Sequence, residues 1–369
     1  MLDHSVTQSS DNLSTPYGRL VAKMAQEHRL LAVHWEMTYR CNHTCTHCYL
    51  DVVPPYPPIA DELITAEAKD IVDQIAAMGA LYLTFSGGEI LVRRDFFPIA
   101  EYARSKRLAI RLMTNGTLIS PLVVGHIADL HPLSVEISLY GADAKTHEAI
   151  TQCPHSFELT LRAFRLLRER GVRTIMKTPL MRENFRQLAD LRVLAASVGA
   201  TFYYDPTITA KDNGGTEPLK HRLTNEEWIS WLRTEIGTSD SIGLRPIEPT
   251  QHPCNSGLSS LVIDPYGNVF PCVQMRIAAG NMRTQSLKSI WNNSPVFRVM
   301  SALTWSKLPV CGACELKLVC KRCHGIALVE TGDFFAPSQT SCSEALARRF
   351  VLIEKGILPS DFPIPAHLK

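Results

Sequence analysis

The sequence predicts an α/β fold built on a parallel sheet, followed by a cysteine-rich region. Apolar stretches typical of strands alternate with amphipathic stretches typical of helices from about residue 31 to residue 209. Beyond them, seven of the eleven cysteines fall between Cys254 and Cys342. A helix between two strands returns the chain in the same direction, so repeated β-α units build a parallel sheet.

Six stretches are predicted to form strands, and those between them carry apolar residues at helical spacing. Thr65 is expected to cap one helix that stops at Gly79, and another runs from Ser156 to Gly171. A partial barrel and an open doubly wound sheet both fit this order. The predicted strands are 31–39 (LAVHWEMTY), 81–89 (LYLTFSGGE), 109–117 (AIRLMTNGT), 133–141 (LSVEISLYG), 173–181 (RTIMKTPLM) and 201–209 (TFYYDPTIT).

Composition and charge point to no strongly charged partner. Apolar residues make up 45% and charged residues 20% of the chain, and the net charge is +2. The basic residues form no block like those of nucleic-acid-binding proteins, and no apolar run is long enough for a signal peptide or a membrane span. We therefore expect a cytoplasmic protein without nucleic-acid or membrane partners. In a reducing compartment its cysteines are expected to bind metal.

Residues that can bind a metal or a ligand gather near the predicted carboxyl ends of the strands, where α/β proteins bind ligands. Three cysteines are one thiolate short of the four that a tetrahedral metal or an iron–sulfur cluster usually takes. These residues are Cys41, Cys45 and Cys48 after the first strand, Gly87, Gly88 and Glu89 at the second, Asn115 at the third, Ser138 at the fourth and Lys177 at the fifth.

The CxxxCxxC spacing of Cys41, Cys45 and Cys48, joined to the GGE of residues 87–89, resembles the radical S-adenosylmethionine (SAM) superfamily over about residues 31 to 210. The resemblance implies a partial six-stranded β/α barrel, similar to a TIM barrel, with a four-iron, four-sulfur (4Fe-4S) cluster on the three cysteines. The open iron would bind SAM, whose reductive cleavage gives a 5′-deoxyadenosyl radical. A reductase or a flavodoxin-type electron donor is implied as a partner.

The same resemblance implies roles for the residues around the cluster. The backbone of Gly87 and Gly88 and the side chain of Glu89 would hold the methionine amino group. His47 stands where the family has a residue whose main chain touches adenine, and Ser138 matches a serine that reaches the ribose. Asn115 and Lys177 are candidate SAM-binding residues by position alone.

Several of these residues also have a simpler interpretation. His43 or His47 could complete a structural zinc site with the three cysteines. Asn115 and Gly116 could form only a turn, because Asn-Gly favours turns. Ser138 could satisfy only backbone groups, and Lys177 could extend its ammonium toward water from a strand end. The sequence identifies no general acid or base.

The C-terminal cysteines resemble the SPASM extension of radical SAM enzymes, which carries auxiliary iron–sulfur clusters. The segment IDPYGNVFPC predicts a hairpin turn at residues 266–268 that delivers Cys272. The resemblance assigns Cys311, Cys314, Cys320 and Cys342 to one complete auxiliary 4Fe-4S cluster, and Cys254, Cys272 and Cys323 to another.

The chain departs from the family pattern in two places. Two residues, instead of three, separate Cys320 from Cys323, and Ser260 stands where some members have another cysteine. The inner auxiliary cluster therefore lacks a fourth cysteine. Its open iron would bind substrate or a small thiol, or be held by His252 or His324. Structural zinc is the alternative for the whole region, since paired CxxC spacing also fits zinc ribbons.

These observations together predict a radical SAM enzyme that modifies a ribosomally made peptide by crosslinking, epimerisation or oxidation, with a sugar or a tetrapyrrole as the alternative substrate. A non-catalytic metal protein is the other class considered. The first strand begins near Leu31, so we expect a separate small peptide-recognition protein rather than a fused module. The predicted parts are an extension (1–24), the barrel (25–210), a linker and helix (211–250), the SPASM region (251–345) and a C-terminal helix and tail (346–369).

Overall fold

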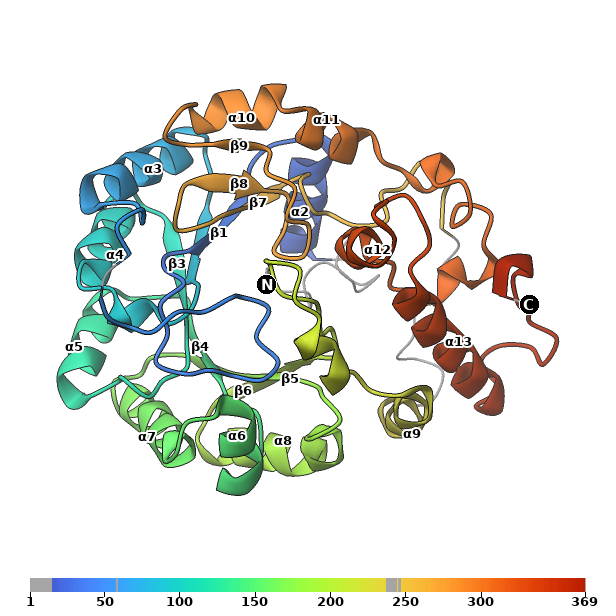
Figure 1. Cartoon of the computed structure of the whole chain (residues 1–369), viewed down its shortest axis with the longest axis horizontal. Helices are drawn as coiled ribbons and strands as arrows, with labels where there is room; N and C mark the ends of the chain where they lie inside the picture. The colour runs from blue at the N-terminus through green and yellow to red at the C-terminus, as the bar shows by residue number, and fades with distance from the viewer. Residues whose placement is uncertain (1–14, 58, 237–243, 245–246, 369) are drawn as a thin grey trace.

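The computed structural model describes residues 15–57, 59–236, 244 and 247–368. One nine-stranded sheet, in the order β6-β5-β4-β3-β2-β1-β7-β8-β9, forms its centre. Each strand from β2 to β6 pairs in parallel with the strand before it in the chain. The chain order never reverses among these six strands, as it would in a doubly wound sheet. The fold is therefore the partial barrel, and Figure 1 shows its helices arranged around the curved sheet.

The six predicted strands are all present, and each is shorter than predicted. The ends of the predicted stretches, such as the GGE of residues 87–89, form loops instead. The barrel strands are β1 Ala32–Glu36, β2 Tyr82–Ser86, β3 Ala109–Thr114, β4 Ser134–Ser138, β5 Thr174–Pro179 and β6 Thr201–Asp205, and β7 Ser260–Ile263, β8 Asn268–Phe270 and β9 Gly280–Asn281 follow.

The helices begin and end close to the predicted signals, with one difference. Thr65 is the first helical residue rather than the N-cap, which is Ile64. Glu67 accepts a hydrogen bond from the Ile64 amide (2.8 Å), and the Thr65 hydroxyl donates to Asp95 (2.6 Å). The helices are α2 Pro16–Gln26, α3 Thr65–Ala77, α4 Phe96–Ser105, α5 Pro121–Asp129, α6 Ala144–Thr151, α7 Ser156–Glu169, α8 Leu188–Ser197, α9 Asn225–Glu235, α10 Leu287–Asn293, α11 Pro295–Ala302, α12 His324–Thr331 and α13 Gln339–Glu354.

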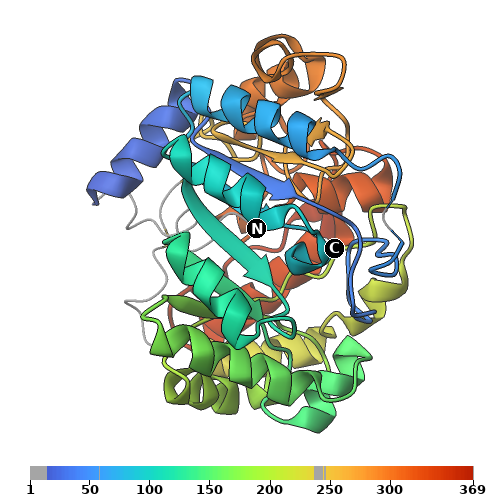
Figure 2. The ribbon, with the colours of Figure 1, turned by 90° about the vertical axis from the view of Figure 1, so that its left-hand side faces the viewer.

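The two faces of the barrel strands differ in polarity because successive side chains point to opposite sides of a sheet. Trp35 of β1 and Phe85 of β2 are fully buried in the apolar core that lies under the helices. Figure 2 shows helices from the first half of the chain lying over this outer face. The alternate residues on the inner face are largely polar: His34, Glu36, Thr84, Ser86, Glu136, Ser138 and Lys177.

The C-terminal region continues the barrel sheet. β7 pairs in parallel with β1, with Val33 opposite Leu261, and β8 returns antiparallel to β7. The turn between β7 and β8 lies where it was predicted. Gly267 has a φ of +85°, and Asp264 accepts hydrogen bonds from the amides on both sides of it. The β7–β8 hairpin that leads to Cys272 is therefore part of the same sheet as the barrel strands.

A second apolar core joins α9 to α13 outside the barrel. Trp228 and Trp231 of α9 pack with Val351 and Leu352 of α13. Thr224 caps α9 through a capping box with Glu227, as the start of the sequence LTNEEW favours. Among the described residues, no helix combines the length and apolar character needed to cross a membrane.

Phe85 should be among the most sensitive positions of the barrel core. Its ring lies 6.2 Å from that of Trp35 and 5.7 Å from that of Phe96, centroid to centroid. The substitution Phe85→Ala is expected to lower the free energy of unfolding by about 3 to 5 kcal/mol because it leaves a cavity. Urea unfolding under anaerobic conditions measures this loss. The control Leu122→Ala, at an exposed position of α5, should change stability by less than about 0.5 kcal/mol.

Candidate functional site

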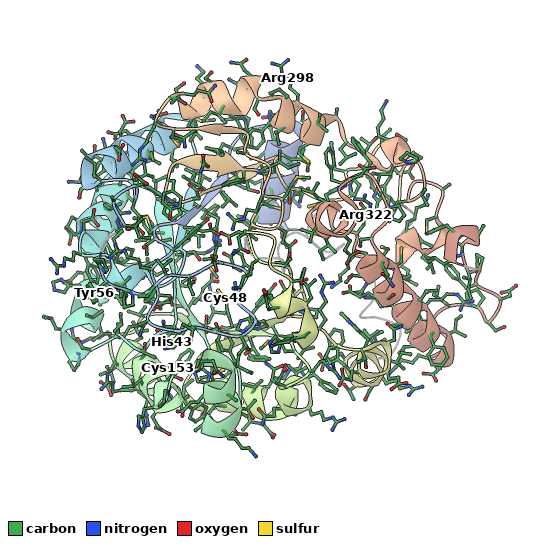
Figure 3. All side chains as sticks on the ribbon, viewed as in Figure 1. His43, Cys48, Tyr56, Cys153, Arg298 and Arg322 are labelled. Atoms are coloured by element: carbon green, nitrogen blue, oxygen red, sulfur yellow. The ribbon has the colours of Figure 1, made fainter. Side chains whose placement is uncertain are left out.

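The loop that follows β1 brings Cys41, Cys45 and Cys48 together at the carboxyl end of the barrel strands. The loop is closed by two backbone hydrogen bonds, from Cys41 to Val53 (2.9 Å) and from Val53 to Tyr39 (3.0 Å). Figure 3 shows Cys48 near the centre of the barrel in this view, whereas Cys153 lies toward α7. The structure thus gathers the three cysteines of the first motif and leaves Cys153 apart from them.

The three thiols would not ionise readily by themselves. Burial raises the pKa of Cys41 to about 12 and that of Cys48 to about 11. It also raises the pKa of Cys45, and the two neighbouring cysteines raise it further. The positive charge of a metal centre is what converts such thiols into thiolate ligands.

Gly87 and Gly88 place the end of β2 directly against the cysteine loop. The Gly88 amide donates to the Thr38 carbonyl (2.8 Å), and the Glu89 amide donates to the Arg40 carbonyl (2.9 Å). A Cβ on Gly88 would lie 2.3 Å from the Arg40 carbonyl oxygen, and one on Gly87 would lie 2.4 Å from that of Thr38. Only glycine permits this backbone contact, so the GG pair fixes where the cysteine loop begins.

Glu89 has no solvent exposure, and three groups donate hydrogen bonds to its carboxylate. They are the Thr114 hydroxyl (2.8 Å to Oε1), the Asn115 amide (2.8 Å) and the Leu91 amide (3.1 Å). Burial raises the pKa of Glu89, and these hydrogen bonds oppose the rise because they favour the charged form. The carboxylate is therefore held in place between the ends of β2 and β3.

Asn115 forms the predicted turn and also contacts the cysteine loop. Gly116 after it has a φ of +80°, as expected for an Asn-Gly turn. The Asn115 side-chain amide donates to the Asn42 side chain (2.8 Å), which is next to Cys41. A turn role and a ligand-binding role are thus compatible at this position.

The other predicted SAM-binding residues lie on neighbouring elements of the barrel. The His47 ring contacts that of Tyr140 edge to face (4.5 Å between centroids), and burial lowers the pKa of His47 to about 3. Ser138 of β4 lies opposite Lys177 of β5 in the sheet. The Lys177 ammonium is 2.9 Å from the Glu136 carboxylate, so Lys177 forms an ion pair inside the barrel rather than extending toward water.

The seven C-terminal cysteines separate into the two predicted sets. Cys254, Cys272 and Cys323 lie close enough to influence one another electrostatically. The other four, Cys311, Cys314, Cys320 and Cys342, line one small cavity together. Within the described ranges, no three or more His, Cys, Asp or Glu side chains converge on a point where one metal ion could be held. A 4Fe-4S cluster does not need such a point, because each cysteine binds a different iron of the cluster.

The two histidines predicted as alternative ligands of the inner set have other contacts. His252 Nδ1 is 2.7 Å from the Leu303 carbonyl oxygen. His324 Nδ1 is 3.2 Å from the Phe334 carbonyl oxygen and also contacts Arg322. Each imidazole therefore has only Nε2 available for a metal, and a ligand role for either histidine stays a prediction.

A buried ion pair that sequence reasoning missed connects the two cysteine-rich regions. Glu36 at the end of β1 is fully buried and accepts two hydrogen bonds from Arg276 (2.7 and 3.0 Å). The hydroxyls of Tyr49 (2.8 Å) and Tyr39 (3.1 Å) donate to the same carboxylate. Tyr49 directly follows Cys48. The available signal was a glutamate at the end of a strand that is predicted to be buried, whereas nothing local distinguished Arg276.

Comparisons with known proteins agree with this geometry. A family model described as the radical SAM superfamily matches residues 35–195, and one described as an iron–sulfur cluster-binding domain, SPASM, matches residues 254–315. The AdoMet-dependent heme synthase of Methanosarcina barkeri is 31% identical over 84% of this chain and 95% of its own. The chain belongs to the radical SAM superfamily. It carries a C-terminal SPASM region.

Other radical SAM proteins are similar over most of the chain. The mycofactocin maturase MftC of Mycobacterium tuberculosis is 29% identical over 77% of this chain and 75% of its own. The structure of Streptococcus suis SuiB bound to the precursor peptide SuiA matches with a TM-score of 0.66 at 15% identity, over 88% of this chain and 79% of that one. The structure of anSMEcpe with bound AdoMet matches with a TM-score of 0.62 at 16% identity, over 90% of this chain and 97% of that one. At such identities these structures support the fold alone.

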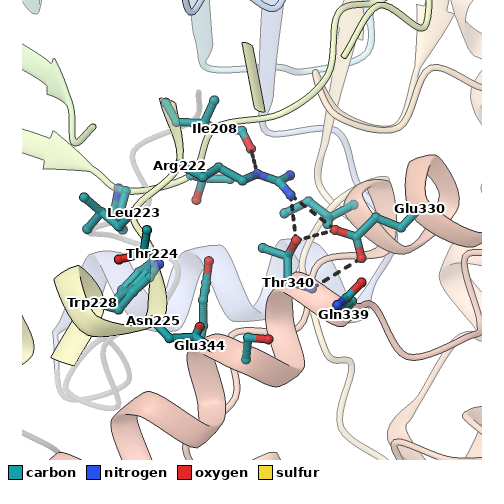
Figure 4. Close-up of a pocket in the computed structure, with 14 residues that line it drawn as sticks. Ile208, Arg222, Leu223, Thr224, Asn225, Trp228, Glu330, Gln339, Thr340 and Glu344 are labelled. Carbon is teal, nitrogen blue, oxygen red and sulfur yellow. Dashed lines mark hydrogen bonds and ion pairs between the residues drawn. The ribbon is translucent and has the colours of Figure 1, made fainter. Parts of the chain in front are cut away.

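A cleft of about 500 Å³ lies between the radical SAM barrel and the SPASM region. Figure 4 shows Arg222 reaching across it from the segment before α9. The Arg222 guanidinium donates to the Ile208 carbonyl (2.8 Å) and the Thr340 hydroxyl (2.6 Å), and it lies 3.3 Å from Glu330. Most of the remaining polar lining carries hydroxyl or amide groups: Thr207, Thr224, Asn225, Gln339 and Ser343.

The Glu36–Arg276 pair should be important for stability. Glu36→Gln is expected to destabilise the fold by about 3 to 5 kcal/mol because it leaves the Arg276 guanidinium buried without a counter-charge. Anaerobic urea unfolding measures the loss. The control Glu158→Gln removes one partner of an exposed pair with Arg165 and should cost less than about 1 kcal/mol. Equal losses in the two variants would contradict a special role for Glu36.

The Gly88 contact can be tested with a single methyl group. Gly88→Ala is expected to weaken SAM binding about tenfold or more, because relief of the overlap with Arg40 must move the cysteine loop. Gly125→Ala is the matched control, since its Cβ would meet no atom within 4 Å and it lies inside α5. Equilibrium binding of SAM and iron content per chain are the measurements. Normal SAM affinity in Gly88→Ala would show that the contact does not position the site.

Proposed function

We propose that this radical SAM enzyme modifies a ribosomally made peptide, by crosslinking, epimerising or oxidising it. The polar inner face of the barrel strands, together with the polar cleft lined by the residues after β6, is the observation that carries the proposal. The mycofactocin maturase named above supports it, as does the subtilosin biosynthesis protein AlbA of Bacillus subtilis, 26% identical over 77% of this chain and 66% of its own.

The charges inside the barrel suit a substrate without many charges of its own. Lys177 pairs with Glu136, and Arg276 pairs with Glu36, so each of these cations already has a carboxylate partner. A substrate with several carboxylates would have to displace such partners and leave them buried without a counter-charge. A peptide segment, whose backbone is polar but uncharged, has no such requirement.

The cleft beside the barrel offers the hydrogen-bonding groups that a peptide backbone needs. Its hydroxyl and amide side chains can both donate and accept, as peptide N–H and C=O groups require. Arg222 and Glu330 neutralise each other there, and the carboxylate of Glu344, which also lines the cleft, pairs with Arg348 (3.5 Å). We propose that the substrate peptide reaches the barrel through this cleft.

The residues at the barrel mouth fit the cofactors that the family typically carries. Cys41, Cys45 and Cys48 would hold a 4Fe-4S cluster. The backbone of Gly87 and Gly88, which is packed against the start of the cysteine loop, would hold SAM beside Glu89. When bound, the cluster supplies the electron for reductive cleavage of SAM. His47, Asn115, Ser138 and Lys177 remain proposed SAM-binding residues. The two C-terminal sets would hold auxiliary clusters.

A tetrapyrrole substrate is the second candidate, and one observation favours it. The heme synthase of Methanosarcina barkeri shares 31% identity with this chain, and the match covers 95% of that protein. Similarity over nearly the whole length extends to the SPASM region as well as the barrel. Under this alternative the enzyme would act on a porphyrin precursor of heme, and the paired cations of the barrel would have to exchange partners.

The test compares the two substrate classes on the same reconstituted enzyme. Under anaerobic conditions with SAM and a chemical reductant, a precursor peptide encoded beside the gene should change in mass and raise the yield of 5′-deoxyadenosine. A porphyrin precursor of heme should be returned unchanged. Conversion of the porphyrin with an unmodified peptide would reject the peptide proposal. Leader-peptide binding with and without a small protein encoded nearby tests the proposed recognition partner.

The triple variant Cys41→Ala, Cys45→Ala and Cys48→Ala is the control for radical chemistry in this test. It should make no 5′-deoxyadenosine, yet retain about eight of an expected twelve or so irons, because the auxiliary sets have ligands of their own. Any SAM cleavage by the triple variant would show that the first motif does not hold the catalytic cluster.

A further inference from the structure

Gln274 is one of the polar side chains that reach the inner set of SPASM cysteines; Ser256 is another, with its hydroxyl oxygen 3.0 Å from the Cys254 sulfur. The Cys323 thiol donates a hydrogen bond to the Gln274 side-chain oxygen, with 2.9 Å between sulfur and oxygen. Gln274 lies two residues after Cys272, which belongs to the same set. One side chain thus contacts one cysteine of the inner set and is held by the segment that carries another.

Three contacts fix the backbone around Gln274. The Met275 amide donates to the Cys272 carbonyl (3.3 Å), so residues 272–275 form a tight turn. Arg276 then donates to the Val273 carbonyl (2.9 Å) while its guanidinium pairs with the buried Glu36. On the other side, a Cβ on Gly325 would lie 2.5 Å from the Gln274 carbonyl oxygen, so only glycine allows α12 to pack this closely.

The hydrogen bond must reverse when Cys323 becomes a metal ligand. A coordinated cysteine is a thiolate and has no proton to donate. The oxygen and the NH₂ group of a glutamine amide exchange places when its terminal bond rotates by half a turn. The NH₂ group of Gln274 can therefore face the same sulfur from the same backbone position.

We infer that Gln274 is a positioning residue of the inner auxiliary cluster, donating an N–H···S hydrogen bond to the Cys323 thiolate and raising the reduction potential of that cluster. The inference rests on the proposed ligand set of Cys254, Cys272 and Cys323. Hydrogen bonds to cluster sulfurs raise the potential because they stabilise the extra electron of the reduced state. The NH₂ group of Gln274 thus serves a cluster sulfur, and the inference gives the side-chain oxygen no role as the fourth ligand.

The outer set provides an internal reference. Arg322 Nε donates to the Cys311 sulfur (3.4 Å), and no part of Gln274 lines the cavity of that set. A substitution at Gln274 should therefore leave the outer cluster unchanged. The cysteines of the first motif lie on the other side of the Glu36–Arg276 pair. The potential of the cluster that they would hold serves as a second reference.

The experiment is a redox titration of the reconstituted enzyme, monitored by electron paramagnetic resonance. Gln274→Leu removes the donor, and Gln274→Glu replaces it with a carboxylate of nearly the same shape that repels a thiolate. Both variants should keep the iron content of the unmodified enzyme. The midpoint potential of the inner cluster should fall in both, and further in Gln274→Glu. The control Gln26→Leu, at an exposed position of α2, should leave every potential unchanged.

The outcomes separate this inference from the ligand assignment on which it rests. An unchanged inner potential in Gln274→Leu would overturn the inference, and so would the loss of inner-cluster iron, because that loss would make Gln274 a ligand. Cys323→Ala tests the ligand set independently and should abolish the inner-cluster signal. Full iron content and an unchanged signal in Cys323→Ala would overturn the ligand set itself.

Discussion

The buried ion pair between Glu36 and Arg276 is the interaction on which the joint between the barrel and the SPASM region depends. Glu36 ends the first strand, and its carboxylate also receives the hydroxyl of Tyr49, next to Cys48. Arg276 closes the turn that carries Cys272 and Gln274. A fully buried carboxylate is tolerated only when it is paired and hydrogen-bonded, so these groups keep one arrangement. The two cysteine-rich regions are thereby held in a fixed relation.

Close backbone contact has a similar effect within the barrel mouth. The glycines after β2 lie against the carbonyl groups of Thr38 and Arg40 at distances that no side chain would allow. Glu89 follows them, and its carboxylate is oriented by donors from the end of β3. Three consecutive strand ends are therefore joined to one another by backbone contacts and hydrogen bonds. A rigid site is what positioning of a cofactor requires.

The division of the barrel strands between an apolar outer face and a polar inner face leaves a hydrophilic interior. Its charges are balanced locally, as in the pair of Lys177 with Glu136. β6 is the edge strand of the sheet, and the residues that directly follow it, 206–208, line the cleft that also contains Arg222. The proposed entry of a peptide through this cleft therefore rests on the position of β6 at the edge of the sheet.

Local patterns in the sequence determined the strands, most helix ends and the grouping of cysteines, because each depends on residues close together in the chain. Gly79, Gly171 and Gly267 fulfilled their predicted roles, since a positive φ is a property of one residue. The strand pattern alone fitted both a barrel and a doubly wound sheet, and the family resemblance implied the barrel. The pairing of distant strands in the tertiary structure confirmed the barrel. Only the tertiary structure placed β7 beside β1, paired Lys177 with Glu136, and brought Arg276 to Glu36 across 240 residues. Such contacts leave no local pattern, because their energy comes from burial that exists only in the folded chain.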